Sequence, residues 1–289
     1  MGLRIAFFGL PLAACLLAGD GHDIAVAFVN RKDAVGRRRL ARLIGADRLV
    51  TTGFGDGALA RAVARVEPDL VVSWFWTRRI PPAVLGVPSR GTLGVHPSLL
   101  PRHRGPDPTY WAILRGDAVT GVTAHRLAAE YDTGAILASE ELVIRDSWNA
   151  FDLAKALDRP SLRLLRATIR RIEAGPVEER EQDESVATLA PFPNEEDHEL
   201  RWAQPTIAVL RQIRALAPQP GAFTELGGEL VTVLRASAAP APRVLEVPGE
   251  AMLVDGLPVV RTADGAVRID AAELDGDSLE PEDWVEVFH

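Results

Sequence analysis

Two residues of this 289-residue chain have the types and positions that acid–base chemistry needs, His96 and Asp132. His96 ends an apolar run within Gly91–Gly105 (GTLGVHPSLLPRHRG), and Asp132 lies within Thr120–Leu137 (TGVTAHRLAAEYDTGAIL). Enzymes of the α/β class place reactive groups at the ends of strands. A histidine with an ordinary pKa of about 6.5 exchanges protons near neutral pH. Taken singly, a histidine that ends a strand is usually a packing or solvated residue, and an aspartate before Thr-Gly is usually a turn former.

Strand-like and helix-like segments alternate around these residues, and this order predicts an α/β fold with a Rossmann-like parallel sheet. Apolar runs predict strands at residues 3–8, 24–29, 48–51, 70–74, 92–96, 121–127 and 135–144. Helices are expected at residues 12–18, 34–44, 57–66, 110–115, 149–157 and 161–174, with Pro160 separating the last two. The first turn, Gly9-Leu10-Pro11, lacks the G-x-G-x-x-G pattern, which argues against a nicotinamide or flavin cofactor.

The remaining sequence predicts a second, smaller domain. We expect residues 1–174 to form a catalytic domain and the charged, proline-bearing residues 175–200 to form a linker. Residues 201–289 then form the second domain, which begins with a helix at 205–216. Its short strand-like runs, at 222–224, 229–234, 244–247, 251–254, 258–262 and 266–269, predict a small β-barrel.

Three ordered motifs carry a resemblance to a known family. HPSLLPRHRG, followed by TGVTAHRL and then DTG, resembles the catalytic half of the 10-formyltetrahydrofolate-dependent formyltransferases, which include methionyl-tRNA and amino-sugar formyltransferases. The resemblance also covers VEPDLVVSW before the loop and RWAQPTIAVLRQIRALAPQPGAF in the second domain. It implies an OB-like second domain and transfer of a formyl group from 10-formyltetrahydrofolate to an amine, without a metal or NAD.

Formyl transfer to an amine has three chemical requirements, and the candidate residues can be compared with each of them. The amine must attack as the free base, an oxyanion develops on the formyl oxygen, and the leaving folate nitrogen needs a proton. The resemblance implies that His96 is the general acid/base and that Asp132 orients it and stabilises its charged form. It also implies a folate pocket formed by Arg78, Arg79, Ile80, Ser98, Leu99, Leu100, Pro101, Ala128, Ala129, Glu130 and Tyr131. Without the motif, Leu99 and Leu100 would be interpreted as core residues.

One position departs from the family pattern. The family places an asparagine two residues before the histidine, where its amide helps to hold the formyl oxygen, and this chain has Gly94 there. Losing one oxyanion donor typically costs a factor of about 100 to 1,000 in rate. His103 and His125 are possible substitutes by position, although we expect both to be surface or substrate-side residues. Gly94→Asn should raise the rate if the missing donor limits it, and should lower it if the site is built around glycine.

Composition limits the location and partners of the chain. It is 47% hydrophobic and 25% charged with a net charge of -8, which gives no overall attraction to phosphate backbones. A single cysteine, Cys15, suits a reducing cytoplasm, where we place the protein. The apolar run at 5–18 leaves an export signal as an alternative, but Gly9 and Pro11 interrupt it. No segment has the ~20 uninterrupted apolar residues of a membrane helix.

The acceptor is predicted from charge. Residues 201–289 contain seven arginines, no lysine and fourteen acidic residues, a net charge of -7 that would repel tRNA. A basic cluster after the second strand could contact a phosphate or be a solvated helix face: Arg31, Lys32, Arg37, Arg38, Arg39 and Arg42. We therefore expect a small primary amine as acceptor, such as a nucleotide-linked amino sugar. Methionyl-tRNA is the alternative acceptor, and a folate- or nucleotide-binding protein without activity or a hydrolytic deformylase are alternatives of other classes. The oligomeric state stays open.

Overall fold

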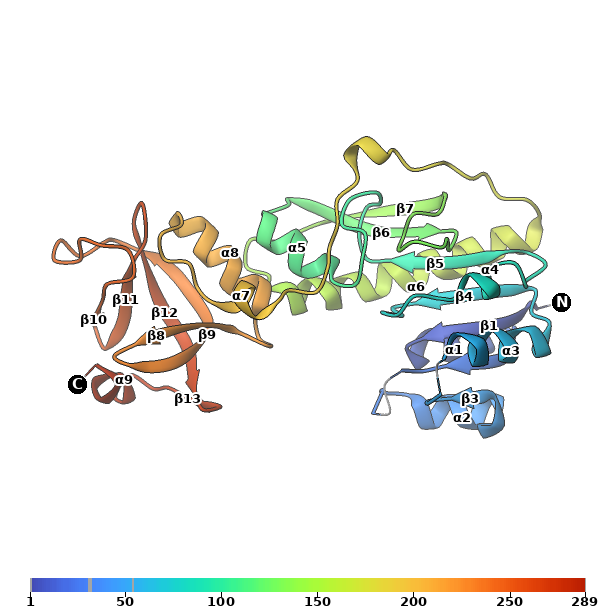
Figure 1. Ribbon diagram of the computed structural model, residues 1–289, viewed down its shortest axis with the longest axis horizontal. Coiled ribbons are helices and arrows are strands. Elements are labelled where there is room, and N and C mark those ends of the chain that lie inside the picture. The colour runs from blue at the N-terminus through green and yellow to red at the C-terminus, as the bar shows by residue number, and fades with distance from the viewer. Residues whose placement is uncertain (1, 31–32, 54, 289) are drawn as a thin grey trace. The chain divides into compact units, whose positions relative to one another are not determined.

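The computed structural model describes residues 2–30, 33–53 and 55–288 (Figure 1). Its contacts divide the chain into two compact units. Unit 1 comprises Met1–Pro108, Val119–Val143 and Ala156–Pro191, and unit 2 comprises Thr109–Ala118, Ile144–Lys155 and Phe192–His289. The domain boundaries expected at residues 174 and 200 stay a prediction. Arg31 and Lys32 of the basic cluster lie outside the described residues.

Unit 1 is built on a seven-stranded sheet with the order β3-β2-β1-β4-β5-β6-β7. The strands are β1 (Arg4–Gly9), β2 (Asp23–Phe28), β3 (Leu49–Val50), β4 (Leu70–Trp74), β5 (Thr92–His96), β6 (Val119–His125) and β7 (Ile136–Val143). β1 to β5 pair in parallel as predicted, whereas β6 is antiparallel to both β5 and β7. The sheet is therefore mixed, because the short β6–β7 connection can join only antiparallel strands.

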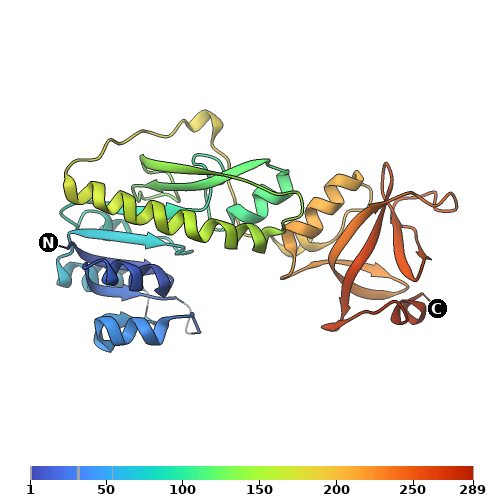
Figure 2. The same ribbon diagram turned by 180° about the vertical axis from the view of Figure 1, so that it is seen from behind.

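Helices cover both faces of this sheet. They are α1 (Pro11–Gly19), α2 (Arg37–Ile44), η1 (Ala46–Arg48), α3 (Asp56–Val66), α4 (Pro82–Leu85) and the part of α6 (Ala150–Ala174) that begins at Ala156. Leu59 and Val63 of α3 and Val84 of α4 pack against Phe8 and Phe28 in one apolar core. α6 lies on the opposite face, as the view from behind shows (Figure 2). There Trp74 of β4 donates its indole N–H to Ser161 Oγ at 3.0 Å.

The prediction that Pro160 separates two helices is wrong, because α6 continues through it. Pro160 removes the backbone donor that would bind the Ala156 carbonyl within the helix. Burial of one apolar stripe of this helix outweighs the local cost of proline. The stripe comprises Leu157, Leu164, Leu165, Ile169 and Ile172.

Unit 2 carries an antiparallel sheet, with β10, β11, β12, β9 and β8 in that order and β13 paired to β12. Its strands are β8 (Ala222–Leu226), β9 (Glu229–Ala239), β10 (Ala251–Val254), β11 (Leu257–Arg261), β12 (Ala266–Leu274) and β13 (Asp277–Ser278). Unit 2 also contains α7 (Glu195–His198), α8 (Thr206–Leu216), α9 (Asp283–Val287), α5 (Pro108–Arg115) from Thr109 on, and the first turns of α6. The chain thus has the predicted α/β part followed by an all-antiparallel part.

The strand predicted at residues 244–247 is wrong. Val244 is 71% exposed, and the backbone N–H groups of Glu246 and Val247 both donate to the Glu250 carboxylate. This local capping replaces ladder hydrogen bonds, so the segment forms a turn. Within the described residues, no helix is long and apolar enough to cross a membrane.

Candidate active site

The loop after β5 is held in place by β6. Pro97 cannot donate to a ladder, so the strand ends at His96. Thr123 of β6 then binds the loop twice: its hydroxyl donates to the Ser98 carbonyl at 2.7 Å and accepts from the Leu100 N–H at 3.1 Å. These bonds fix the path of the chain immediately beyond the predicted general acid/base.

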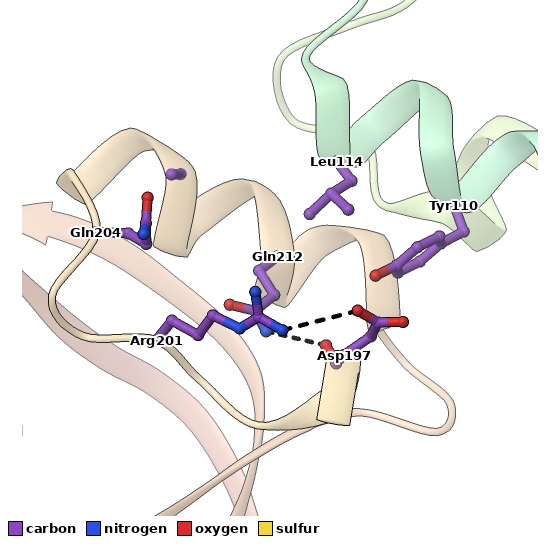
Figure 3. Close-up of a pocket in the computed structure, with 7 residues that line it drawn as sticks. Tyr110, Leu114, Asp197, Arg201, Gln204 and Gln212 are labelled. Carbon is purple, nitrogen blue, oxygen red and sulfur yellow. Dashed lines mark hydrogen bonds and ion pairs between the residues drawn. The ribbon is translucent and has the colours of Figure 1, made fainter. Parts of the chain in front are cut away.

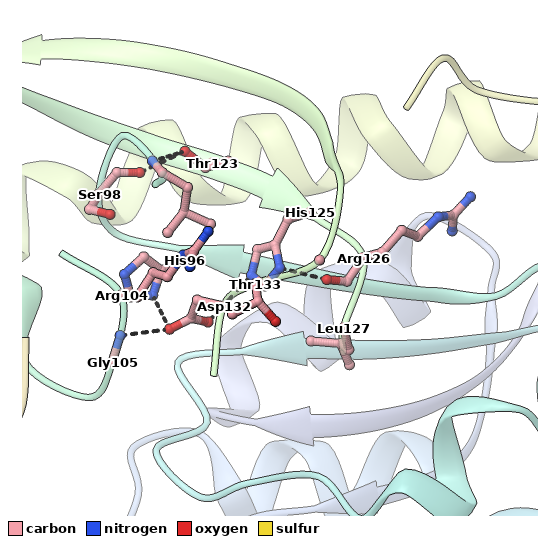
Figure 4. Close-up of polar contacts among 12 residues, drawn as sticks. His96, Ser98, Arg104, Gly105, Thr123, His125, Arg126, Leu127, Asp132 and Thr133 are labelled. Carbon is pink, nitrogen blue, oxygen red and sulfur yellow. Dashed lines mark hydrogen bonds and ion pairs between the residues drawn. The ribbon is translucent and has the colours of Figure 1, made fainter. Parts of the chain in front are cut away.

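His96 and Asp132 lie together, as the motif predicts (Figure 4). The His96 side chain is 7% exposed, and its Nδ1 lies 3.4 Å from Asp132 Oδ2. Its Nε2 is 2.7 Å from the His103 carbonyl oxygen, which can only accept, so Nε2 carries a proton. Asp132 Oδ2 also accepts from the Gly105 N–H at 2.9 Å. One carboxylate thus joins the end of β5 to the loop that follows it.

Asp132 lies in the β6–β7 loop with a left-handed backbone, at a φ of 55°. Asparagine and aspartate tolerate this conformation better than most residues. Gln182 holds the loop from outside, since its amide N–H groups donate to the Asp132 and Gly134 carbonyls at 2.7 Å each. Nothing in the charged, aperiodic stretch around Gln182 distinguishes this residue in the sequence.

Gln182 belongs to a segment that we call the strap, residues 180–190, which includes η2 (Glu184–Val186). The strap pairs with the start of β7 and with the loop after β5: Arg180 exchanges backbone hydrogen bonds with Ile136, and the Ala190 N–H donates to the Arg104 carbonyl at 2.7 Å. The buried Arg104 guanidinium binds Gln182 and Glu184 of the strap. The strap is therefore attached by hydrogen bonds to the segments that carry the candidate site.

His125 is the main correction to the predicted site. Its side chain is 2% exposed and His103 is buried as well, so the expectation that both are surface residues is wrong, whereas a substrate-side place for His125 stays a prediction. His125 pairs with Gly94 in the β5–β6 register. Its Nδ1 is 2.7 Å from the Arg126 carbonyl oxygen, and its Nε2 is 3.5 Å from Asp132 Oδ1. Burial lowers the pKa of His125, and the negative charge of Asp132 opposes this shift.

A narrow pocket opens beside this cluster. Its lining includes Ser73, Trp76, Arg78, Arg79, Ile80, His125, Leu127, Ala128, Glu130, Tyr131 and Asp132. Two of the predicted folate segments, 78–80 and 128–131, therefore meet at one place, although Ala129 is not in this lining. Trp76, Ile80 and Leu127 offer apolar surface for a flat ring, with charged side chains at the edge, so the residues suit a pterin.

The other predicted folate residues lie elsewhere. Ser98 and Leu100 are buried, and the Ser98 hydroxyl donates to the Arg102 carbonyl at 2.6 Å. Leu99 and Pro101 are partly buried in the same loop. None of these four is in the lining of the pocket beside Asp132. Their contact with folate stays a prediction.

A second hollow lies within unit 2, lined by Tyr110, Leu114, Asp197, Arg201, Gln204, Ala208 and Gln212 (Figure 3). Gln212 donates to the Asp197 and Glu199 carbonyls at 2.9 and 2.7 Å. Asp197 also pairs with Arg201 at 3.9 Å and completes a capping box with Asn194. These polar groups bind one another and connect α7 to α8, which gives the hollow a structural explanation.

The cluster of His96, Asp132 and His125 can hold and pass a proton. Each imidazole has one nitrogen on a backbone carbonyl and the other on the shared carboxylate. When either imidazole takes a proton, its positive charge lies beside the buried negative charge of Asp132. This arrangement suits a reaction in which one nitrogen loses a proton and another gains one.

Comparison with known proteins gives a consistent result. Residues 11–169 match the family described as Formyl transferase, and residues 194–289 match Formyl transferase, C-terminal domain. Methionyl-tRNA formyltransferase from Chlorobium limicola is 31% identical, over 96% of this chain and 93% of that protein.

Two solved structures share the fold. HypX from Aquifex aeolicus, in complex with tetrahydrofolic acid, has a TM-score of 0.69 and 23% identity, over 100% of this chain. The chain spans about half of HypX, 48% of its length. The N-formyltransferase from Helicobacter canadensis, with folinic acid and dTDP-3-aminofucose, has a TM-score of 0.71 and 15% identity, over 96% of this chain and 100% of that one.

Proposed function

Because the chain belongs to the formyl transferase family, we propose that it transfers a formyl group from 10-formyltetrahydrofolate to a primary amine on a small acceptor. The acceptor that we favour is a nucleotide-linked amino sugar. The observation that supports the transfer is the buried His96–Asp132–His125 cluster beside a pocket formed by two predicted folate segments. The cluster would take the proton of the amine and supply one to the folate nitrogen.

Charge supports the small acceptor. The net charge of residues 201–289 is -7, and proteins that dock on RNA gain affinity by neutralising phosphates. The Helicobacter canadensis enzyme, which shares the fold, was solved with a nucleotide-linked amino sugar. A sugar of this type offers a primary amine on a ligand small enough to reach a narrow pocket.

Methionyl-tRNA is the second candidate acceptor, and the relatives favour it. The Chlorobium limicola protein carries that activity in its name and aligns with 96% of this chain. A second relative, from Synechococcus, is 36% identical over 95% of this chain and has the same name. The acidic second domain is the feature that argues against RNA docking here.

The test is a paired acceptor assay with the purified full-length chain and 10-formyltetrahydrofolate. Tetrahydrofolate release would be followed with a panel of nucleotide-linked amino sugars and, separately, with charged initiator tRNA. We expect turnover with at least one amino sugar and a lower kcat/KM with tRNA. Higher kcat/KM on tRNA would establish the second candidate instead. Formate release without any acceptor would indicate a hydrolase, and folate binding with no turnover would indicate a binding protein.

A further inference from the structure

We infer that Ser73 is a catalytic residue of this chain, and that its hydroxyl takes over the task of the family asparagine that Gly94 replaces. The hydroxyl donates a hydrogen bond to the formyl oxygen, both in the bound folate and in the oxyanion that follows. The inference rests on the proposed function, because it assigns a donor within formyl transfer. His96 and Asp132 keep the transfer of the proton.

Ser73 lies beside Gly94 in the sheet. The β4–β5 register pairs Ser73 with Gly94, and the β5–β6 register pairs Gly94 with His125. Paired residues of neighbouring strands, about 4.8 Å apart, direct their side chains to the same face of a sheet. One row across three strands therefore carries a hydroxyl, a position without a side chain and an imidazole.

This row lies on the side of the sheet that carries the reacting groups. Side chains alternate along a strand, so residue 94 shares a face of β5 with His96, two positions further on. Ser73 and His125 both line the pocket that Asp132 also lines. A formyl group that enters this pocket to reach the His96–Asp132 pair therefore comes close to the Ser73 hydroxyl.

Gly94 leaves room beside this hydroxyl. A Cβ atom added to residue 94 would lie 2.8 Å from His125 Nε2, 3.0 Å from its Cε1 and 2.7 Å from Leu127 Cδ2. These three are the nearest atoms, so the side that faces Ser73 is the less crowded one. An asparagine at residue 94 would collide with the imidazole, whereas a formyl oxygen can approach the glycine from the side of Ser73.

The two histidines that are possible substitutes by position do not offer this hydrogen bond. His125 Nδ1 lies 2.7 Å from the Arg126 carbonyl oxygen, which can only accept, so the one N–H of the neutral ring is already used. Burial lowers the pKa of His125 and thus favours this neutral ring. His103 is buried and is not in the lining of the pocket.

Ser73 is the donor of the lining that suits this place. It is half-buried on a central strand, and no described residue forms a hydrogen bond with its hydroxyl. The indole nitrogen of Trp76 is buried. The other side-chain donors of the lining belong to exposed residues: Arg78, Arg79 and Tyr131. The Ser73 hydroxyl is thus available to a ligand at the level of Gly94.

The reaction step balances with Ser73 as a hydrogen-bond donor only. As the amine nitrogen bonds to the formyl carbon, one electron pair of the C=O bond moves onto the oxygen, which accepts from the Ser73 hydroxyl. The pair returns as the bond between this carbon and the folate nitrogen breaks. The His96–Asp132 pair takes the proton of the amine and supplies one to the folate nitrogen, so Ser73 keeps its own proton throughout.

The first test compares Ser73→Ala with the wild type in the acceptor assay. Loss of one donor to an oxyanion should lower kcat about 100- to 1,000-fold, with little change in the KM for the folate. The factor should be the same at every pH tested, because the hydroxyl does not titrate. Ser139→Ala, at an exposed position of β7, is the matched control. Near wild-type kcat for Ser73→Ala, or a rise in KM alone, would overturn the inference.

A second readout does not depend on turnover. The stretching frequency of a ¹³C-labelled formyl carbonyl falls when its oxygen accepts a hydrogen bond. With 10-formyltetrahydrofolate bound and no acceptor present, infrared difference spectra should show a lower frequency for the wild type than for Ser73→Ala. Tetrahydrofolate, which lacks the formyl group, should bind both equally by calorimetry. Equal frequencies would overturn the inference, whereas no turnover by the wild-type chain with any amine would contradict the proposed function instead.

The third test uses the room at Gly94. Gly94→Ala adds a methyl group against the His125 ring and beside Ser73, so we expect kcat to fall about 10- to 100-fold while tetrahydrofolate still binds. Gly94→Asn should lower kcat as well, although it restores the amide of the family. Gly86→Ala is the matched control, because a Cβ there meets nothing within 4 Å. A faster Gly94→Asn variant would show that the oxyanion donor is still missing, and would overturn the role of Ser73.

Discussion

At the scale of single residues, Asp132 is the group that the other members of the site share. It faces His96 with one oxygen and His125 with the other, and the Gly105 N–H holds it in place. One carboxylate thus faces two imidazole rings, each of which has its other ring nitrogen on a backbone carbonyl. Its loss should therefore disturb both histidines together.

Asp132→Asn should lower kcat by about 100- to 10,000-fold, because it removes the negative charge that stabilises a protonated imidazole. Asparagine accepts the same left-handed backbone, so the loop should fold. Asp255→Asn is a matched control, since Asp255 also has a left-handed φ, 51°, but lies exposed in unit 2. Steady-state kinetics and thermal denaturation of both variants check this, and equal loss of activity in the two would contradict it.

The lowered pKa of His125 also predicts a pH dependence of stability. In the folded state burial disfavours the charged ring, while in the unfolded chain it takes a proton near the ordinary pKa of about 6.5. The free energy of unfolding should therefore be highest above that pKa and fall as the pH drops through it toward the lower folded pKa.

Comparison of wild type with His125→Gln isolates this effect. Between pH 7.5 and 5, the free energy of unfolding should fall more steeply for the wild type than for the variant, which has no proton to bind at residue 125. Hydrogen exchange of β5 and β6 amides reports on this part of unit 1. His198→Gln controls for the loss of a histidine elsewhere, and parallel slopes for wild type and His125→Gln would show that residue 125 titrates alike in both states.

The sequence predicted His96 and Asp132 because each lies in a recognisable motif at the end of an apolar run. It could not place His125. Whether that ring is buried depends on the β5–β6 register, which pairs it with Gly94, and on the chain-distant Asp132. The sequence shows that residue 94 has no side chain, but it does not show that His125 lies beside it.

At the scale of elements, the strap holds the loop after β5 and the β6–β7 loop, which carry the candidate site. It bonds to the loop after β5 through Arg104 and His103, whose N–H donates to Thr188 Oγ1 at 2.8 Å. It bonds to the β6–β7 loop through Gln182. A segment with little regular structure thus sets the separation of His96 and Asp132.

Gln182→Glu tests this positioning. Glutamate keeps an oxygen for the Arg104 guanidinium but places a second acceptor against the Asp132 and Gly134 carbonyls. We expect kcat to fall about 10- to 100-fold through misplacement of Asp132, with little change in KM for the folate. Gln219→Glu, in an exposed loop, makes the same charge change away from the site. If the KM for folate rises while kcat holds, the strap contributes to binding rather than to positioning.

The positions of helices and strands could be predicted where the burial of apolar residues alone determines them. The inner strands β1, β2 and β4 are apolar because the sheet is covered on both faces, and their positions followed from the sequence. The continuation of α6 through Pro160 did not follow from the sequence, because burial of the apolar stripe of the helix outweighs the strong local signal of proline. The turn at 244–247 was predicted as a strand because its residues are apolar. A local contact overrides this pattern, since the Glu250 carboxylate accepts the backbone N–H groups of Glu246 and Val247.

At the scale of the whole molecule, charge is distributed unevenly along the chain. The net charge is -8, and residues 201–289 account for -7 of it, which leaves the first two hundred residues close to neutral. The described part of the basic cluster lies on α2, where Arg38, Arg39 and Arg42 are exposed. The acidic second domain would therefore repel an acceptor with many phosphates, whereas the exposed arginines of α2 would attract it.

Salt dependence distinguishes the two acceptors at this scale. A protein that neutralises six to ten phosphates loses about 10³ to 10⁵ in affinity between 50 and 200 mM salt, whereas the diphosphate of a nucleotide sugar should cost less than about tenfold. We expect the KM for the preferred acceptor to change within this smaller limit. In an Arg38→Gln, Arg42→Gln double variant the salt slope should stay the same, because a small ligand does not need that helix. A steep slope that flattens in the double variant would show that α2 binds a polyanion, and the acceptor would then be an RNA despite the charge of the second domain.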